Sequence, residues 1–261
     1  MGAGMRLTFL GTGTSHGVPM IGCPCAVCRS TDPKDRRLRS SVVIECGGTA
    51  MLIDAGPDFR TQALRAGLAR VDALLLTHAH ADHIFGIDDL RRFNELQRGP
   101  IPVRGSENTL RAVRRMFAYA FNGGTRGSTR PALALQTVSG PFEVGPLRVE
   151  PLPVAHGPMR IYGYRVSAGG RSLAYIPDCS GMPGSTERRL AHGLDLMILD
   201  ALRPTPHPTH LSFSEAVDLL QRIGAKRSLT THMGHAMAHD AVAASLPEGI
   251  EPAWDGQVVA W

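Results

Sequence analysis

The sequence predicts a single layered α/β domain, with β-sheets inside and helices outside. Strand-like and helical patterns occur in both halves of the chain, and no fixed-period repeat or low-complexity linker divides its 261 residues. A chain of about 260 residues is compatible with one domain or with two. Because no boundary is visible in the sequence, we expect one domain over residues 1–261.

The composition indicates a globular protein with enough apolar residues for a packed core. Hydrophobic residues make up 43% of the chain and charged residues 20%, which is ordinary globular usage and excludes a disordered chain. Apolar runs are only a few residues long, whereas a membrane span needs about 20, and no signal-peptide pattern is present. We therefore expect a cytoplasmic protein with no membrane partner.

The distribution of charge makes a nucleic-acid partner an unfavoured hypothesis. The net charge of +5 comes from 28 basic and 23 acidic residues, and no block of one sign stands out. This balance favours tolerance of anionic ligands over a continuous nucleic-acid track.

Short runs of apolar and β-branched residues predict strands throughout the chain. The first is followed directly by a glycine-rich loop over residues 11–19. The predicted strands are 5–10, 41–45, 50–53, 71–76, 147–152, 161–166, 172–176, 194–199 and 228–231.

The clearest helix is predicted over residues 213–223. Ser212 and Glu215 form a capping box before it, its apolar residues fall on one face, and Gly224 follows its last turn. Weaker patterns predict helices over 58–66, 87–97 and 109–121, and a flexible glycine-rich segment over 122–128.

A cluster of histidines and aspartates follows the strand predicted over 71–76. His78, His80, Asp82 and His83 lie within six residues, a pattern that chance would give in about one chain in a thousand of this composition. On an extended segment His78 and His80 point the same way, whereas Asp82 and His83 project differently once the chain turns into a helix. The motif can therefore bind two ions, the arrangement that hydrolases use when two ions share a hydroxide.

Three further residues with metal-binding side chains come directly after predicted strands. They are His156, Asp178 and His232. Strand ends that meet at one edge of a sheet are where catalytic loops gather. We therefore expect these residues to complete the coordination of the two ions.

Three of the five cysteines form a separate group. Cys23, Cys25 and Cys28 are packed into one short loop, which in a cytosolic chain indicates a metal site before disulfides. Thiolates favour Zn²⁺ with one more ligand, but local spacing does not identify the fourth. Cys46 and Cys179 are expected to be core residues.

The motif H-x-H-x-D-H with later His, Asp and His resembles the metallo-β-lactamase fold hydrolases. The resemblance implies an αβ/βα sandwich of two mixed β-sheets flanked by helices, with a binuclear site at one edge. It implies His78, His80 and His156 on one metal, Asp82, His83 and His232 on the other, and Asp178 bridging them. Asp54 would be a carboxylate that orients these ligands from behind.

Asp82 as a ligand, in a motif without cysteine, resembles the phosphodiesterase branch of this fold. The cysteine loop, together with Thr231–His235, resembles the PhnP-type phosphodiesterases of the carbon–phosphorus lyase pathway. This resemblance implies that His235 is the fourth ligand of a structural zinc, which would contribute to folding. It also implies Mn²⁺ or Zn²⁺ at the catalytic site, cyclic ribose phosphates as substrates, and a homodimer.

A phosphodiesterase also needs an acid for the leaving oxygen. His210 stands just before the capped helix, whose N-terminus favours anions, and the family has a histidine in the matching position. We expect a hydroxide bridging the two ions to attack phosphorus in line, Asp82 to orient or deprotonate it, and His210 to protonate or stabilise the departing oxygen. The remaining histidines, expected at the surface, are His16, His192, His207 and His239.

Two alternatives remain open. A transfer-RNA 3′-processing endonuclease shares the fold and the metal motif, but this chain shows no long basic arm to grip transfer RNA. A noncatalytic module resembling the B protein of pyrroloquinoline quinone biosynthesis would share the cysteine loop, but in that family the histidine motif is degraded, whereas here it is whole.

Overall fold

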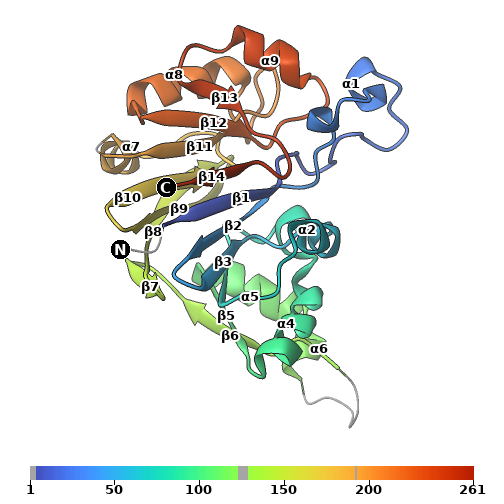
Figure 1. Ribbon diagram of the computed structural model, residues 1–261, viewed down its shortest axis with the longest axis vertical. Helices are drawn as coiled ribbons and strands as arrows, with labels where there is room; N and C mark the ends of the chain where they lie inside the picture. The colour runs from blue at the N-terminus through green and yellow to red at the C-terminus, as the bar shows by residue number, and fades with distance from the viewer. Residues whose placement is uncertain (1–3, 123–128, 192) are drawn as a thin grey trace.

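The computed structural model describes residues 4–122, 129–191 and 193–261. Within these residues, the strands form two mixed seven-stranded sheets that pack face to face, with helices on the outer sides (Figure 1). This is the layered arrangement that the sequence predicts. Of the segment predicted to be flexible, 123–128 lies outside the described residues.

Each sheet is antiparallel in one part and parallel in the other. In the first, β14, β1, β2 and β3 are antiparallel neighbours and the strands from β3 to β6 are parallel. From edge to edge it holds β14 (Val258–Ala260), β1 (Arg6–Gly11), β2 (Ser41–Cys46), β3 (Thr49–Ile53), β4 (Ala73–Leu75), β5 (Ile101–Gly105) and β6 (Leu133–Thr137).

The second sheet repeats this organisation in reverse. The strands from β7 to β10 are antiparallel and those from β10 to β13 are parallel. From edge to edge it holds β13 (Ile250–Pro252), β12 (Arg227–Thr231), β11 (Leu196–Asp200), β10 (Arg171–Ile176), β9 (Met159–Ala168), β8 (Leu147–His156) and β7 (Phe142–Val144).

The main core lies between the two sheets. Phe9 and Met51 of the first sheet and Tyr164 and Tyr175 of the second are fully buried in one cluster, so each sheet covers the apolar face of the other. The Tyr164 hydroxyl donates a 2.7 Å hydrogen bond to the carbonyl of Leu76. This bond ties the second sheet to the chain just ahead of the histidine motif.

Helices cover the outer face of each sheet and form separate apolar clusters with it. Those on the first sheet are α2 (Phe59–Ala66), α4 (Leu90–Gln97), α5 (Glu107–Met116) and α6 (Ala118–Phe121). Those on the second are α7 (Gly184–Leu190) and α8 (Phe213–Ile223), with α9 (His239–Ser245) beside β13. The short α1 (Ala26–Arg29), α3 (Ala81–Ile84) and the 3₁₀ turns Pro33–Asp35 and Ile87–Asp89 lie in connections.

The helix with the strongest local signals matches its prediction. In α8, Ser212 and Glu215 form the reciprocal capping box and Gly224 ends the helix in the left-handed conformation. The helix predicted over 109–121 is instead two helices, because Phe117 leaves helical geometry between α5 and α6.

The strands that the sequence did not reveal are short, and several contain residues that disfavour strands. They are β5, β6, β7, β13 and β14. Pro102 in β5 and Pro252 in β13 weaken the local pattern, so pairing with neighbouring strands determines their structure.

No helix within the described residues is both long enough and apolar enough to cross a membrane.

Candidate metal centre

Both sheets contribute side chains to one edge of the sandwich. From the first sheet, the chain after β4 carries His78 and His80, and α3 carries Asp82 and His83. From the second, His156 ends β8, while Asp178 and His232 follow β10 and β12. Because β10, β11 and β12 are parallel neighbours, their carboxyl ends meet at the same edge.

A close backbone contact positions the helix that carries Asp82 and His83. A Cβ atom on Gly56 would lie 1.9 Å from the Asp82 carbonyl oxygen, so only glycine lets the loop after β3 pack against α3. The Ala55 amide donates a 2.8 Å hydrogen bond to the carbonyl of His83. The turn that the sequence shows as Asp-Ala-Gly therefore holds the second half of the motif in place.

The first donor group consists of His78, His80 and His156. One ligand atom of each lies within 4.8 Å of the others, and His78 Nε2 is 2.9 Å from His80 Nδ1. His156 Nδ1 donates to the carbonyl of Thr209 at 2.8 Å, which leaves its Nε2 for a metal. These three imidazoles can share one ion.

The second donor group consists of Asp82, His83 and His232, whose ligand atoms also lie within 4.8 Å of one another. Asp178 reaches both groups. Its Oδ1 lies 3.0 Å from His232 Nε2, and its Oδ2 lies 2.8 Å from His83 Nε2 and 3.9 Å from His78 Nδ1. The structure thus brings the seven predicted ligands together.

Asp54 lies behind the second group. Its carboxylate is fully buried and accepts hydrogen bonds from the amide and hydroxyl of Thr77 and from His83 Nδ1, at 2.8–2.9 Å. The last bond directs His83 Nε2 into the site. Asp54 (φ 61°) and His232 (φ 59°) both have left-handed backbone conformations, which cost a residue with a side chain roughly 1–2 kcal/mol and are typical of functional sites.

The electrostatics of the second group favour cations. Burial alone would lower the pKa of His232, but Asp178 and Asp82 raise it to about 10. Burial likewise opposes ionisation of Asp178, but His232 and His83 hold its pKa well below the usual value. In the protein without metal, positive charge on the imidazoles balances the buried carboxylates.

Hydrogen-bond geometry at the centre also fits bound divalent ions. His83 Nε2, Asp178 Oδ2 and both ring nitrogens of His232 are buried without a hydrogen-bond partner among the described residues. His83 Nε2 and Asp178 Oδ2 are close but are not aligned as donor and acceptor. Each unsatisfied buried group costs about 1–3 kcal/mol. Coordination to an ion would remove this cost for His83 Nε2, Asp178 Oδ2 and His232 Nε2, whereas His232 Nδ1 lies on the other side of its ring, 3.8 Å from Asp200 Oδ1.

An open cavity of about 340 Å³ leads to these groups. Its described lining includes His80 and His156 of the first group, Asp82 and His232 of the second, and Asp178 and His210, but no lysine or arginine. His210 Nδ1 donates to Asp200 Oδ2 at 2.8 Å and lies 3.4 Å from Asp178 Oδ1. Asp200 therefore orients the His210 ring at the edge of the metal centre.

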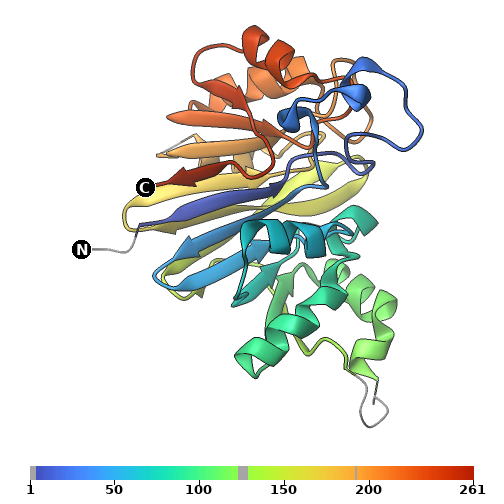
Figure 2. The same ribbon diagram turned by 45° about the vertical axis from the view of Figure 1, so that its right-hand side comes forward.

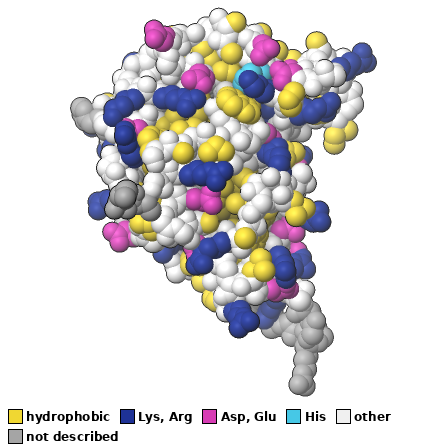
Figure 3. Space-filling model, in the orientation of Figure 1, with side chains coloured by type: hydrophobic (Ala, Val, Ile, Leu, Met, Phe, Trp, Pro, Cys, Tyr) yellow, Lys and Arg dark blue, Asp and Glu magenta, His cyan; other side chains and the backbone are white. Residues whose placement is uncertain are grey.

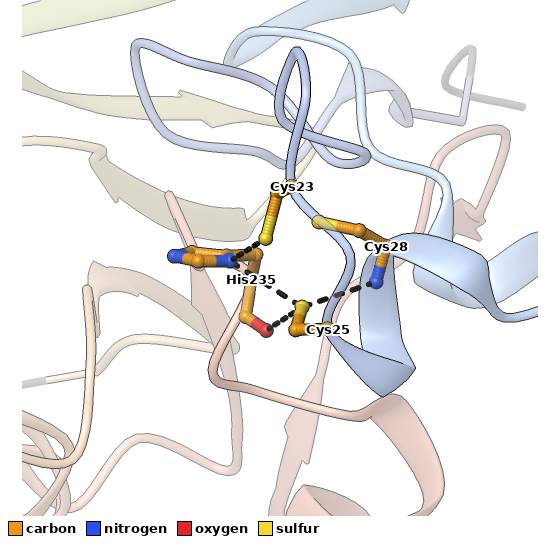
Figure 4. A group of neighbouring side chains, drawn as sticks. All are labelled: Cys23, Cys25, Cys28 and His235. Atoms are coloured by element: carbon orange, nitrogen blue, oxygen red, sulfur yellow. Dashed lines mark hydrogen bonds between the residues drawn. The ribbon is translucent and has the colours of Figure 1, made fainter.

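The cysteine loop and the segment after β12 form a second cluster (Figure 4). Cys23 Sγ and Cys25 Sγ lie 3.2 and 3.4 Å from His235 Nδ1, close to the roughly 3.5 Å between nitrogen and sulfur ligands of one tetrahedral zinc. Cys28 completes the group. Figure 2 shows the segment around α1 beside the C-terminal half of the chain.

A buried arginine holds the segment that carries His235. Arg37 is 1% exposed and donates to the carbonyls of Gly234 and Met237 at 3.4 and 2.6 Å. The hydrogen bond that the Cys28 amide donates and the nearby His235 lower the pKa of Cys25 to about 6, whereas burial raises the pKa of Cys28 to about 11. Cys25 is therefore the thiolate that is accessible at neutral pH before a metal binds.

Comparison with known proteins identifies the family. The family described as Beta-lactamase superfamily domain matches residues 49–233. The chain belongs to this superfamily. The predicted αβ/βα sandwich is therefore confirmed, and the fold implies a hydrolase that uses divalent metal ions.

Individual relatives within the superfamily differ in their described activities. A crystal structure of a diphosphatase from the PhnP family is 41% identical, with a TM-score of 0.92, and the match covers 100% of this chain and 98% of that one. An octanoyltransferase of Porphyromonas gingivalis is 38% identical over 97% of this chain, which spans about half (51%) of that protein's length. A coenzyme PQQ synthesis protein B of Methylobacterium radiotolerans is 30% identical, over 75% of this chain and 72% of its own.

Sequence reasoning missed Asp200, although a signal was present. Asp200 is the last residue of β11, so it obeys the same strand-end rule that pointed to His156, Asp178 and His232. Thr77 hydrogen-bonds to Asp54, and the carbonyl of Thr209 accepts from His156. Neither threonine belongs to a motif from which its role could be predicted.

The expectation that His239 lies at the surface is wrong. His239 is 4% exposed: its ring lies 5.8 Å from the Trp254 ring at a right angle, and its amide donates to Asp35 Oδ1 at 2.8 Å. His16 is exposed and His207 half-buried, while His192 lies outside the described residues.

Cys25→Ser should remove one equivalent of zinc and lower the melting temperature. Release of the cysteine loop should lower the free energy of unfolding by about 2 kcal/mol. For a chain of this size that corresponds to a fall in melting temperature of roughly 4–8 °C. Metal analysis and thermal unfolding measure both effects. Cys46→Ala, in the core between the sheets, is the control and should keep its zinc; equal zinc in Cys25→Ser and the parent would contradict the site.

Proposed function

We propose that this protein is a metal-dependent phosphodiesterase that hydrolyses small phosphodiesters, including cyclic ribose phosphates. One observation carries the proposal: His210, which the buried Asp200 holds through Nδ1, lines the same cavity as members of both metal-donor groups and the carboxylate of Asp178 between them. A proton donor beside a site able to activate water is what diester hydrolysis requires, and this arrangement supports the proposal. The similarity to a PhnP-family diphosphatase supports phosphorus chemistry.

The donor groups suit two catalytic ions, Mn²⁺ or Zn²⁺. We assign His78, His80 and His156 to one ion, Asp82, His83 and His232 to the other, and Asp178 to both. Bound there, the ions would supply a nucleophilic hydroxide at neutral pH and neutralise charge on the phosphoryl oxygens. The cluster of Cys23, Cys25, Cys28 and His235 would hold a structural zinc.

The chain's own side chains supply orientation and proton transfer. Asp82 is 13% exposed at the cavity wall and lies 3.3 Å from His83 Nε2, so one carboxylate oxygen can orient the attacking water. Asp200 holds the His210 ring through Nδ1, which leaves Nε2 available to the leaving oxygen. Asp54 keeps His83 in its binding orientation through the 2.8 Å bond to Nδ1.

Two features favour this function over the alternatives. The cavity of about 340 Å³ suits a small ligand, and on the face in Figure 3 basic and acidic side chains are interspersed, which does not favour a transfer-RNA substrate. The complete donor groups favour catalysis over a noncatalytic module.

A substrate panel tests the function. Chelator-treated protein, supplied with Mn²⁺ or Zn²⁺, should hydrolyse bis(4-nitrophenyl) phosphate, but neither 4-nitrophenyl phosphate nor a β-lactam. Turnover should return as about two equivalents of metal bind beyond the structural zinc. Metal-loaded protein that leaves the diester intact, or prefers the lactam, would rule the proposal out.

A further inference from the structure

Two exposed apolar side chains stand next to the metal centre, one beside each donor group. Met159 is 37% exposed and lines the metal cavity, and Phe85 is 53% exposed. A single apolar side chain at the surface needs no explanation. Here, however, the local backbone fixes each of the two beside a predicted metal ligand.

The hairpin between β8 and β9 places Met159 beside His156. The two residues are directly opposite in the antiparallel ladder, so their side chains lie on one face with Cβ atoms about 4.5–5.5 Å apart. Gly157 makes the turn at a φ of 57°, and its amide donates to Ser180 Oγ at 2.9 Å. Because the turn is anchored in this way, the Met159 side chain stays at the wall of the cavity.

The end of α3 places Phe85 beside Asp82. Phe85 keeps helical dihedral angles as the C-cap residue, and residues three apart on a helix have Cβ atoms about 5–6 Å apart. Asp82 lines the cavity, so Phe85 borders it on that side. The Phe85 ring meets the ring of Phe117 edge-on, with 6.5 Å between the centroids, and Phe117 is buried. The exposed ring therefore rests on a fixed support.

The chemistry of these two side chains suits a flat, uncharged ring. Thioethers make favourable contacts with aromatic rings, and phenylalanine stacks against them. Among the described residues, no lysine or arginine lines the metal cavity, so nothing there pairs with a further anionic group. The volume of about 340 Å³ is at the small end of the range for ligand sites, which suits a ring better than a long acyl chain.

We propose that Met159 and Phe85 form an apolar rim that binds a nucleobase, so that the preferred substrates are phosphodiesters of nucleosides and not of simple sugars or alcohols. The inference rests on the proposed phosphodiesterase function. The rim contacts the base and takes no part in breaking the bond, so it selects among diesters that react at the same atoms.

Three cyclic diesters with the same reacting atoms test the rim. They are adenosine 2′,3′-cyclic phosphate and the 2,3-cyclic phosphates of methyl and cyclohexyl β-D-ribofuranoside. The parent, loaded with metal, should prefer the adenosine diester to the methyl riboside by about 10- to 100-fold in kcat/KM, the range that stacking of one base provides. The cyclohexyl riboside is apolar but not flat, and it should fall between them.

Substitutions in the rim should reduce this preference. Phe85→Ala should lower the ratio of the two kcat/KM values about 5- to 50-fold, and Phe85→Tyr, which keeps the ring, should retain it. Met159→Ala should lower the ratio about 2- to 10-fold, and Met159→Leu should retain most of it. Leu64→Ala is the control, because Leu64 is a 66% exposed apolar residue on α2, and it should leave every rate unchanged. Metal analysis should show the parental metal content in all variants.

The outcomes separate the rim from the proposed function. Equal kcat/KM for the adenosine diester and the methyl riboside, or for the adenosine and cyclohexyl diesters, overturns the nucleobase assignment and leaves the phosphodiesterase function standing. A preference that is unchanged in both Phe85→Ala and Met159→Ala overturns the rim. Hydrolysis of bis(4-nitrophenyl) phosphate without hydrolysis of the adenosine diester also overturns the rim alone, whereas hydrolysis of neither overturns both proposals.

Discussion

Asp178→Ala should abolish hydrolysis of bis(4-nitrophenyl) phosphate and remove both catalytic ions together. The Asp178 carboxylate is 2% exposed and lies between His83 Nε2 at 2.8 Å and His232 Nε2 at 3.0 Å. Its removal takes away the carboxylate that lies between the two donor groups, so each ion would lose a negatively charged ligand. We expect a fall in kcat/KM on the order of 10³-fold or more, because the nucleophile depends on the ions.

Metal analysis and kinetics on the same preparation distinguish this effect from unfolding. The variant should keep the zinc of the cysteine cluster, since Asp178 makes no contact with it. Asp195→Asn is a matched control at the opposite end of β11, where Asp195 pairs with Lys226 and Arg171, and it should keep all ions and the parental rate. An Asp178→Ala protein with its full metal content would refute the bridging role.

His210→Ala should slow the hydrolysis of an unactivated cyclic diester by about 10²- to 10⁴-fold, the usual contribution of a general acid. The loss on bis(4-nitrophenyl) phosphate should be much smaller, because nitrophenolate leaves without a proton. The side chain stands 4.9 Å, ring to ring, from His232 and is held by Asp200. The ratio of the two losses therefore measures proton transfer rather than general damage to the site.

Asp200→Asn separates orientation from proton donation. Asparagine can still accept from His210 Nδ1 and from the Cys179 amide, which bonds to Asp200 at 2.9 Å, but it lacks the charge. The same leaving-group dependence with a smaller loss of rate would fit a positioning role for Asp200.

If His210→Ala cleaved the cyclic diester as fast as the parent, the acid would have to be another group.

The strands that carry the ligands could be predicted because their sequences are strongly apolar and end in residues that coordinate metals. Residues 172–176 and 228–231 are buried on both faces, and Asp178 and His232 follow them within two residues. Asp200 also stands at a strand end, but it belongs to no motif that the resemblance supplied, so the strand-end rule was not applied to it. Its role depends on its distance from His210, which only the packed sheet determines.

The remainder of the site depends on contacts between residues distant in sequence. The bond from His156 to the carbonyl of Thr209 joins residues 53 positions apart. A cavity of about 280 Å³ beside His210 forms where the loop after β1 meets the loops after β11 and β12. His207 looks like a surface histidine in the sequence because its surroundings come from these other loops. Local patterns contain no information about such pairings.

The origin of the ligands in two different sheets has a consequence for substitutions far from the chemistry. The separation of the sheets depends on interleaved side chains such as Phe9, Met51 and Tyr175, and a change of even one methylene in such a core shifts its neighbours. A shift between the layers alters the spacing of the ligands that follow β4 in the first sheet relative to those at the ends of β8, β10 and β12 in the second. Gradual change in the interior can thus retune metal preference or turnover while every residue at the catalytic edge stays the same.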